Sequence, residues 1–416
     1  MKIIFILLVF VMSAHSQSNS QPQPASADSR FASELFNSYG EYAFAPMTSR
    51  HFKHAELLSY LETMKTLLGP LMSTEQVGIS AEGRSINLVK IGTGPTKVFL
   101  WSQMHGDEPT ATMALFDVMN YIGKNRNSVE VKNILSQTTL LIIPMVNPDG
   151  AERFQRRTWQ GIDMNRDAVR LQTPEAKILK SVRDTYTPEI GFNLHDQDPR
   201  YTVGETGQVS TIALLAPAYN VAKEDNVVRT RAKQLTATIA NTLRQFIPDN
   251  ISRYDDTFEP RAFGDNIQKW GTSTILIESG GWKDDPQKMF IRKLNYVALL
   301  SVFNAIASRS YEKTSLTDYE RIPFNTRNLY DMIITKTTLK FPDARPSLTA
   351  DIGINYEEIR DANGIFQQRA RVVDIGDLSV FFAHDTLDGT GKTIDGSLVE
   401  LNDIVTLDDI RKALSR

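Results

Sequence analysis

Four apolar runs alternate with helical patterns along most of the chain, and this alternation constrains the fold more than any other feature. The runs are KVFLWSQM (97–104), TTLLIIPMV (138–146), EIGFNL (189–194) and STILI (273–277). Segments with apolar residues at helical spacing lie between them, for example TATMALFDVMNYIGKN and TPEAKILKSVRDTY. Continuous apolar strands that alternate with helices are typical of a largely parallel sheet covered on both faces. The sequence therefore predicts an α/β fold.

Other patterns in the sequence indicate where the α/β domain begins and ends. HFKHAELLSYLETMKTLLGPL (51–71) has helical periodicity, and STEQVGISAEGRSINLVKIGTG (73–94) alternates around glycine turns as a β-hairpin does. KLNYVALLSVFNAIASRSY predicts the last helix, and short alternating stretches with Gly and Asp turns follow it. We therefore predict an α/β domain over 31–312 and a smaller β-rich C-terminal domain over 313–416. The alternative is an extension that packs on the core.

The first thirty residues have the composition of a targeting segment. One Lys precedes an apolar stretch over residues 3–12 that is too short to span a bilayer of about 30 Å, and AHS has the small residues that signal peptidase requires. This predicts a signal peptide over 1–16, with an uncleaved anchor as the alternative, and a flexible Pro- and Ser-rich linker over 17–30. The mature protein is then secreted or periplasmic, without stable membrane insertion. With no cysteine in the chain, its stability would come from core burial.

Polar, chemically capable residues follow each of the four apolar runs directly. The four junctions read HGDE, NPDG, HDQD and ESGG. In open α/β sheets, ligands bind in the crevice beyond the carboxyl ends of the strands. One polar junction would be an ordinary turn, but four of them predict a single site that is assembled from distant segments.

A metal centre is the chemistry that this site favours. Without cysteine, any metal must be held by His, Asp or Glu, and two His with one Glu form an established zinc ligand set that leaves an open position for water. His105 and Glu108 lie three residues apart at a strand-to-helix junction, and His195 follows another strand. The spacing His-x-x-Glu is weak evidence alone, and a lone His195 would be read as a capping or buried neutral histidine. Together the three residues predict a metal site.

The other four histidines are not expected to bind metal. His15 leaves with the signal peptide, and His51 and His54 lie in a polar segment where we expect them to be solvated. His384, in FFAHDTLDG, is expected to be a surface turn residue of the C-terminal domain.

Several charged residues could complete the chemistry. Glu278 ends a buried strand beside the predicted cation, where a partly desolvated carboxylate can act as general base and then general acid, although it could also cap the next turn. Arg156, Arg157 and Arg166 could each bind a carboxylate by two parallel hydrogen bonds, and Asn165 could add another. An arginine near the metal would also stabilise an oxyanion. Asp163 could accept a hydrogen bond from a ligand histidine and fix its tautomer.

Five separated motifs then resemble those of the zinc carboxypeptidase family, in the same order along the chain. They are His105-x-x-Glu108, NPDG, GIDMNRD, a later His195 and STILIESGG, and the resemblance covers about residues 45–310. It implies a mixed sheet sandwiched by helices, with one Zn²⁺ per chain at the strand ends. By resemblance, His105, Glu108 and His195 correspond to the zinc ligands. Glu278 corresponds to the general base that acts on a zinc-activated water.

The resemblance also implies roles for the residues between these motifs. Asn165 and Arg166 correspond to the pair that grips the terminal carboxylate of the substrate. Arg156 corresponds to the arginine that polarises the scissile carbonyl, with Arg157 as the fallback. Asp163 corresponds to the carboxylate behind the first zinc histidine.

The chain departs from the family pattern in three places. It has NRD where Asn-Arg-Asn is common, so Asp167 either alters charge preference at the carboxylate site or points away from it. A tyrosine that closes over the substrate is expected somewhat before the base, and Tyr254 is the nearest candidate, but the register does not assign it. The C-terminal region does not clearly match the transthyretin-like domain that often follows this fold.

The leading hypothesis is a secreted zinc exopeptidase that hydrolyses the C-terminal peptide bond of a peptide or peptide-like substrate with a free carboxylate. A second is a zinc amidase on non-protein amides, such as murein peptides or N-acyl amino acids. A non-catalytic binding module would lack a ligand or the base, and none is missing. The formal net charge of −3 over 416 residues gives no electrostatic reason to expect nucleic acid as a partner.

Overall fold

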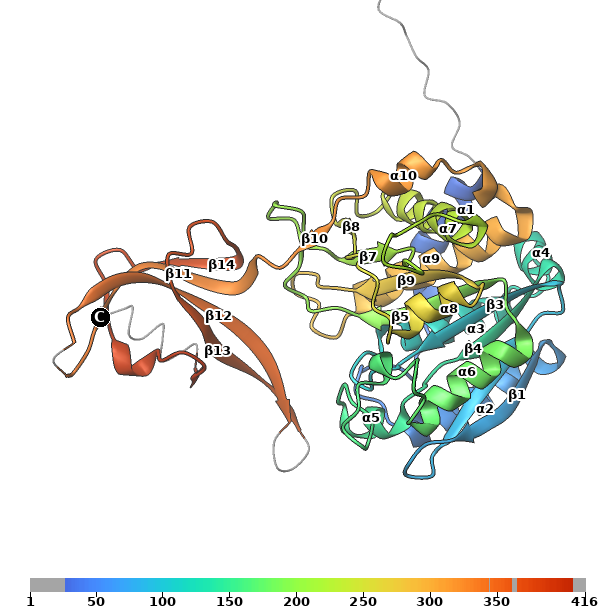
Figure 1. The fold of residues 1–416 in the computed structure, drawn as a ribbon, viewed down its shortest axis with the longest axis horizontal. Coiled ribbons are helices and arrows are strands. Elements are labelled where there is room, and N and C mark those ends of the chain that lie inside the picture. Colours follow the sequence, from blue (N-terminus) through green and yellow to red (C-terminus); the bar gives the residue numbers. More distant parts are fainter. Residues whose placement is uncertain (1–26, 344, 361–364, 407–416) are drawn as a thin grey trace, which may run out of the picture.

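The computed structural model describes residues 27–343, 345–360 and 365–406, and it has two parts (Figure 1). A large α/β domain lies on the right of the view, and a smaller β-rich domain lies on the left. The predicted signal peptide and most of the predicted linker lie outside the described residues. The predicted fold class is confirmed, including the β-rich C-terminal region.

An eight-stranded mixed sheet forms the centre of the α/β domain, in the order β1-β2-β4-β3-β5-β9-β7-β8. Its strands are β1 (Met72–Ile79), β2 (Ser85–Ile91), β3 (Thr96–Ser102), β4 (Thr138–Ile143), β5 (Ile190–Asp196), β7 (Ile212–Leu215), β8 (Ile251–Arg253) and β9 (Ser273–Ser279). The four apolar runs of the sequence form β4, β3, β5 and β9, which are adjacent and parallel. The predicted hairpin forms β1 and β2, an antiparallel pair. The carboxyl ends of the four central strands therefore meet at one edge of the sheet.

Helices cover both faces of this sheet because successive strand residues point to opposite sides. On β3, Val98 and Leu100 face one core cluster, and Phe99 and Trp101 face the other. The first cluster packs under α1 (Ala27–Tyr42), α2 (His54–Leu68), α3 (Thr110–Lys124), α4 (Val129–Gln137), α7 (Val227–Leu243) and α9 (Met289–Ser308). The second packs under α6 (Pro174–Tyr186) and α8 (Phe263–Lys269). The short helix α5 (Pro148–Arg153) follows β4.

Helix α9 is the central helix of the larger cluster. Among the described helices, it alone is long and apolar enough to cross a membrane by length and composition. Most of it is buried inside the protein, where it contacts α1, α3, α4 and α7. A helix that is apolar on all sides is expected at the core of a large domain. Its composition is therefore explained by packing.

The C-terminal domain is a second sheet with its own core. Its strands are β11 (Leu329–Lys340), β12 (Leu348–Arg360), β13 (Phe366–Gly376), β14 (Phe382–Asp388), β15 (Thr393–Asp395) and β16 (Ile404–Val405). They pair in the order β14-β11-β12-β13-β16, with β15 also on β11. Ile334, Ile352 and Val372 are fully buried in this core. The region therefore has the hydrophobic centre that a separate domain requires.

The predicted boundary between the two domains at residue 313 stays a prediction, and contacts of the following residues favour a later position. Helix α10 (Leu316–Glu320) packs on α7, and Tyr319 and Ile322 belong to the core of the α/β domain. We therefore propose that the α/β domain continues to Ile322 and that the C-terminal domain begins at β11. Between them, β10 (Asn325–Thr326) pairs with β6 (Thr202–Val203) of the α/β domain.

Candidate metal centre

The polar junctions that follow the central strands gather at one edge of the sheet. His105 lies three residues after β3, and His195 and Glu278 lie near the ends of β5 and β9. The register of these two parallel strands places His195 directly beside Glu278. The sheet topology therefore brings together three residues that are far apart in the sequence.

Close backbone packing between two loops positions His105. The main-chain nitrogen of Asn147 donates to the carbonyl of Gln103 over 3.0 Å, and the Gln103 amide side chain donates to the carbonyl of Gly106 over 3.0 Å. A Cβ atom on Gly106 would lie 2.0 Å from the main-chain carbon of Gly150. Only glycine fits at this approach, so the glycine of HGDE lets its loop pack against NPDG.

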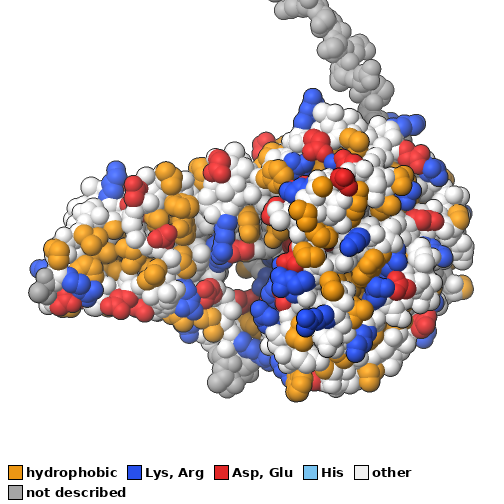
Figure 2. All heavy atoms as spheres, viewed as in Figure 1, with side chains coloured by type: hydrophobic (Ala, Val, Ile, Leu, Met, Phe, Trp, Pro, Cys, Tyr) orange, Lys and Arg blue, Asp and Glu red, His pale blue; other side chains and the backbone are white. Residues whose placement is uncertain are grey.

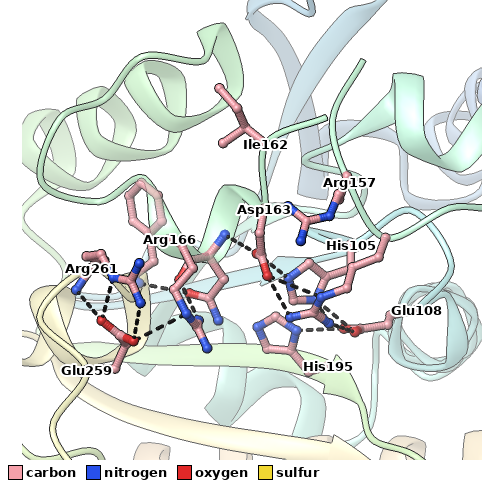
Figure 3. Close-up of polar contacts among 12 residues, drawn as sticks. His105, Glu108, Arg157, Ile162, Asp163, Arg166, His195, Glu259 and Arg261 are labelled. Carbon is pink, nitrogen blue, oxygen red and sulfur yellow. Dashed lines mark hydrogen bonds and ion pairs between the residues drawn. The ribbon is translucent and has the colours of Figure 1, made fainter. Parts of the chain in front are cut away.

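His105, Glu108 and His195 form a buried cluster whose side chains point toward one another (Figure 3). Glu108 Oε1 lies 2.7 Å from His105 Nδ1, and Glu108 Oε2 lies 2.6 Å from His195 Nδ1. Their potential ligand atoms all lie within 4.8 Å of one another, and the three residues are only 2%, 7% and 2% exposed. The predicted metal residues are therefore brought together.

Asp163 and Arg156 complete the surroundings of this cluster. Asp163 Oδ1 lies 3.0 Å from His105 Nε2, the ring nitrogen that faces away from Glu108. Arg156 donates to Asp163 Oδ2 through Nε over 3.2 Å and through a terminal nitrogen over 3.0 Å. Its other terminal nitrogen lies 3.0 Å from Glu108 Oε1 and 3.1 Å from His105 Nδ1. A guanidinium thus reaches the point where the acceptor atoms converge.

The buried charged groups of the cluster shift one another's pKa values, and burial lowers the pKa of His195. Burial lowers the pKa of His105, but the charge of Glu108 and the hydrogen bond to Asp163 more than offset it and raise that pKa to about 9. Burial raises the pKa of Glu108, but the two imidazoles hold it well below its usual range. A carboxylate and two imidazoles without a sulfur ligand match the donor set of zinc sites. The residues present therefore fit a divalent ion.

Glu278 is the other carboxyl group of the site. It is buried at the end of β9, and burial, followed by the negative charge of Glu108, raises its pKa well above the usual value. A carboxyl group with a raised pKa can both accept and return a proton near neutral pH. Such perturbed groups are common at functional sites. The role of general base stays a prediction for Glu278.

A second polar group lies beside the cluster and contains Arg166 (Figure 3). Arg166 Nε lies 3.3 Å from Glu259 Oε2, and Arg261 makes two hydrogen bonds of 2.9 Å to the same carboxylate. Asn165 Oδ1 accepts a 2.9 Å hydrogen bond from the main-chain nitrogen of Phe263, which ties the Asn165–Arg166 segment to the start of α8. The guanidinium groups of Arg166 and Arg261 therefore both bind the carboxylate of Glu259.

The contacts of Arg157 and Asp167 show whether each side chain points toward the cluster or away from it. Arg157 donates to the carbonyl of Gly161 over 3.0 Å, so Arg156 is the arginine that reaches the cluster. Asp167 is buried and accepts from the main-chain nitrogens of Gln172 and Thr173 over 2.9 and 2.8 Å. Its carboxylate therefore binds the main chain just before the start of α6 and does not point toward Arg166.

Three histidine predictions are wrong in their environment. His54, expected to be solvated, is buried, and its Nε2 lies 2.9 Å from the carbonyl of Ser85. His51 is partly buried and stacks on Phe366 of the C-terminal domain. His384 lies in strand β14 and is partly buried, not in an exposed turn. The partners of these histidines are distant in sequence, so local polarity could not identify them.

Sequence reasoning also left residues near the site unassigned. Tyr254 lies close enough to the site that the negative charge of Glu278 adds to burial in raising its pKa. Glu259 and Arg261 were missed because they lie in a polar loop, FEPRAFG, that has no recognisable spacing. Only the distance to Arg166 distinguishes them from ordinary surface charges.

Comparison with known proteins agrees with this geometry. The sequence profile described as zinc carboxypeptidase matches residues 57–198. Probable carboxypeptidase 2 of Arthroderma benhamiae is 28% identical over 133 residues, which are 32% of this chain and 24% of that protein. Carboxypeptidase B of Astacus astacus is 32% identical over 106 residues, which are 25% of this chain and 34% of that protein. The aligned part thus spans 24% and 34% of these two relatives.

Solved structures share the fold. A metallo-carboxypeptidase from Burkholderia cenocepacia matches 62% of this chain and 70% of its own, with a TM-score of 0.50 and 15% identity. Bovine thrombin-activatable fibrinolysis inhibitor, solved with a tick carboxypeptidase inhibitor, matches 63% of this chain and 97% of its own, with a TM-score of 0.51 and 14% identity. The sheet and its helical layers therefore define a carboxypeptidase-like fold. Residues 57–198 thus match the zinc carboxypeptidase family, which is the family that the motifs resemble.

Proposed function

We propose that this protein is a zinc-dependent metallocarboxypeptidase that removes a residue from the free C-terminal end of a peptide or peptide-like substrate. The observation that carries the proposal is the buried convergence of His105, Glu108 and His195 beside a carboxyl group, Glu278, whose pKa is raised. The family match supports the same conclusion for residues 57–198, which include the three predicted ligands. Glu278 lies outside that matched segment and rests on its position in the sheet.

In this proposal, His105, Glu108 and His195 hold one Zn²⁺, and Asp163 fixes the tautomer and orientation of His105. The bound ion supplies a Lewis acid that polarises the scissile carbonyl and makes water more acidic. Glu278 accepts a proton from the attacking water as the new C–O bond forms. It then gives that proton to the amine nitrogen as the C–N bond breaks, so protons and electron pairs balance.

Two arginines would handle the negative charges of the reaction. Arg156 reaches the ligand cluster and is placed to donate to the carbonyl oxygen as it becomes an oxyanion. Arg166 and Asn165 would bind the free carboxylate of the substrate, and this contact would restrict cleavage to the chain end. The exposure of Arg166, 40% of its side chain, leaves room for such a ligand beside Glu259.

We also propose that the protein is exported. The support is the sequence of residues 1–16, which has the charge, apolar length and small residues of a cleavable signal peptide. N-terminal sequencing of the protein recovered outside the producing cell tests this proposal, with Gln17 as the expected first residue. An N-terminus at Met1 in a membrane fraction would contradict it.

The activity is tested with peptides that have either a free or an amidated C-terminus. We expect release of the last residue only from the free peptide, and loss of release after chelation of the metal. Glu278→Gln is expected to lower kcat by roughly 10²- to 10⁴-fold while about one zinc per chain is retained, because this residue is not a predicted ligand. Equal cleavage of the amidated peptide would contradict the exopeptidase assignment.

Adjacent arginines provide a matched control. Arg156→Gln is expected to lower kcat by roughly 10²- to 10³-fold, as removal of an oxyanion donor does. Arg157→Gln removes the same charge one residue away, where the side chain contacts only the carbonyl of Gly161 among the contacts described for it. It is expected to retain wild-type kcat. Equal losses in the two variants would show that net charge, not the position of Arg156, matters.

A further inference from the structure

The C-terminal domain contacts the α/β domain through several polar contacts near the linker and through a second contact at the ends of β12 and β13. Near the linker, Arg200 and Asp331 form an ion pair of 2.9 Å, and Asp198 and Arg327 form one of 3.0 Å. The second contact involves the ends of β12 and β13, and Figure 2 shows a gap between the two domains. The second contact is therefore not a consequence of the chain connection.

An ion pair and a ring stack form this second contact. Glu358 of β12 accepts a 2.8 Å hydrogen bond from Arg50, and His51 Nε2 lies 3.1 Å from the same oxygen. The His51 ring stacks on Phe366 of β13, with 3.9 Å between centroids and 10° between planes. The two strands pair in this region, since Arg360 lies opposite Phe366.

Phe154 joins this contact to the candidate active site. Its ring packs edge-on against His51 at 4.4 Å and against Phe366 at 5.2 Å, and the Arg50 guanidinium lies 5.1 Å from its centroid. Phe154 has a left-handed backbone with φ of 50°, which a bulky residue adopts rarely and only where its surroundings hold it. Arg156 follows two residues later. Phe154 ends α5, where its N–H donates to carbonyls of that helix, and the ring of Phe366 adds a contact from the C-terminal domain.

We propose that Glu358 and Phe366 are positioning residues for Arg156, so that the β12–β13 hairpin of the C-terminal domain forms part of the catalytic unit. The hairpin holds His51, Arg50 and Phe154, and Phe154 sets the path of the segment that carries the guanidinium. This inference rests on the proposed function, because it assigns the hairpin an effect on the reaction through Arg156. Misplacement of a reacting group by about 1 Å costs on the order of 100-fold in rate.

Steady-state kinetics of full-length, zinc-loaded variants test the proposal. Phe366→Ala is expected to lower kcat by roughly ten- to a hundredfold with little change in KM, because substrate binding at Arg166 is untouched. Phe366→Leu keeps most of the side-chain volume but cannot stack on His51. Its kcat is expected to lie between those of wild type and Phe366→Ala. Glu358→Gln should lower kcat, whereas the control Glu357→Gln, whose partner Arg371 lies within the same domain, should not.

A double-mutant cycle separates positioning from a general structural effect. In the Arg156→Gln background, Phe366→Ala is expected to change kcat by less than about twofold, since the group that it positions is gone. The same ten- to hundredfold loss in both backgrounds would overturn the proposal. An unchanged kcat for Phe366→Ala in the wild-type background would overturn it as well.

Hydrogen exchange gives a readout that does not need the activity. The main-chain nitrogens of Phe154 and Gln155 donate to carbonyls in α5 over 3.1 and 3.0 Å, so both amides should be protected. Phe366→Ala is expected to speed their exchange by about tenfold or more, and Glu357→Gln should leave it unchanged. Unchanged exchange of these two amides in Phe366→Ala would refute the proposal that Phe366 supports the Phe154 segment. A further outcome is that wild type cleaves no peptide while Phe366→Ala still speeds amide exchange at Phe154 and Gln155. In that case the proposed activity is wrong, but the proposed effect of Phe366 on the Phe154 segment is supported.

Discussion

Zinc is expected to raise the midpoint temperature of unfolding, and Glu108→Gln is expected to abolish that rise. Glu108 is the centre of the ligand cluster, since each of its oxygens contacts a different imidazole at 2.7 or 2.6 Å. In the variant, an amide nitrogen replaces one of these oxygens and cannot serve as a ligand. The remaining amide oxygen would lie beside one imidazole and the amide nitrogen beside the other, so the neutral side chain also loses the negative charge that a carboxylate offers to the ion.

The size of the shift follows from mass action. A ligand that binds only the native state stabilises it by about 2.7 kcal/mol when its free concentration is 100 times Kd. Unfolding entropies of about 2.1 cal/mol/K per residue give roughly 0.6 kcal/mol/K for a domain of roughly 300 residues. The expected rise in Tm is therefore about 4 °C for wild type, and below about 1 °C for Glu108→Gln.

Calorimetry with chelated and zinc-loaded protein measures these shifts, and elemental analysis counts the bound metal. Glu175→Gln provides the control, because Glu175 is also a fully buried carboxyl group but lies in α6 and contacts the main chain at Ala81. It is expected to change Tm in the chelated state and to keep the zinc-dependent rise. A rise of the same size in Glu108→Gln and wild type would refute the assignment of Glu108 as a ligand.

Three further substitutions test the surroundings of the site and the core. Asp163→Asn is expected to weaken zinc binding by about 10- to 100-fold in chelator competition, whereas Asp167→Asn should leave it unchanged; equal affinities would show that Asp163 does not orient the ligand. Burial raises the pKa of Asp265 to about 7, so the native state holds this proton longer than the unfolded chain does. The contribution of Asp265 to stability should therefore fall as the pH rises from 3.8 to about 7, and the pH profiles of urea unfolding for wild type and Asp265→Asn should differ by this amount; identical profiles contradict the shift. Arg292→Met is expected to cost about 3–5 kcal/mol in urea unfolding, because it leaves the buried carboxylate of Asp117 unpaired, and a loss below about 1 kcal/mol would show that the pair is dispensable.

The ligand cluster could be predicted from the sequence because it depends on strand ends. Apolar runs identify buried strands, and parallel strands place their carboxyl ends at one edge, so the residues that follow must converge. His105 and His195 needed no knowledge of loop conformation, since each lies within three residues of a strand. Asp163 and Arg156 lie in a longer connection, and only the family resemblance selected Arg156 over Arg157.

The parts that could not be predicted depend on contacts that no spacing in the sequence indicates. Asp167 follows the proposed carboxylate-binding pair directly, yet its two oxygens accept from the main-chain nitrogens of Gln172 and Thr173. His51 and Phe366 are more than 300 residues apart in the numbering and belong to different domains, so no periodicity relates them. Our proposed later domain boundary rests on similar contacts, since α10 packs on α7 and Tyr319 is buried in the core of the α/β domain.

The site thus combines two kinds of support. The proposed metal ligands are buried at the ends of paired strands, where a substitution should alter metal binding and stability together. The arginines that would meet the substrate lie on loops and contact carboxylates outside the sheet, Asp163 for Arg156 and Glu259 for Arg166. Substitution of Glu259, or of Phe366 in our proposal, should alter kcat or KM at nearly constant metal content, whereas Asp163 also contacts His105 and should affect metal binding as well. If loss of metal binding and loss of kcat occur in different variants, the metal residues are held by the sheet alone. The position of Arg156 would then depend on the C-terminal domain as well.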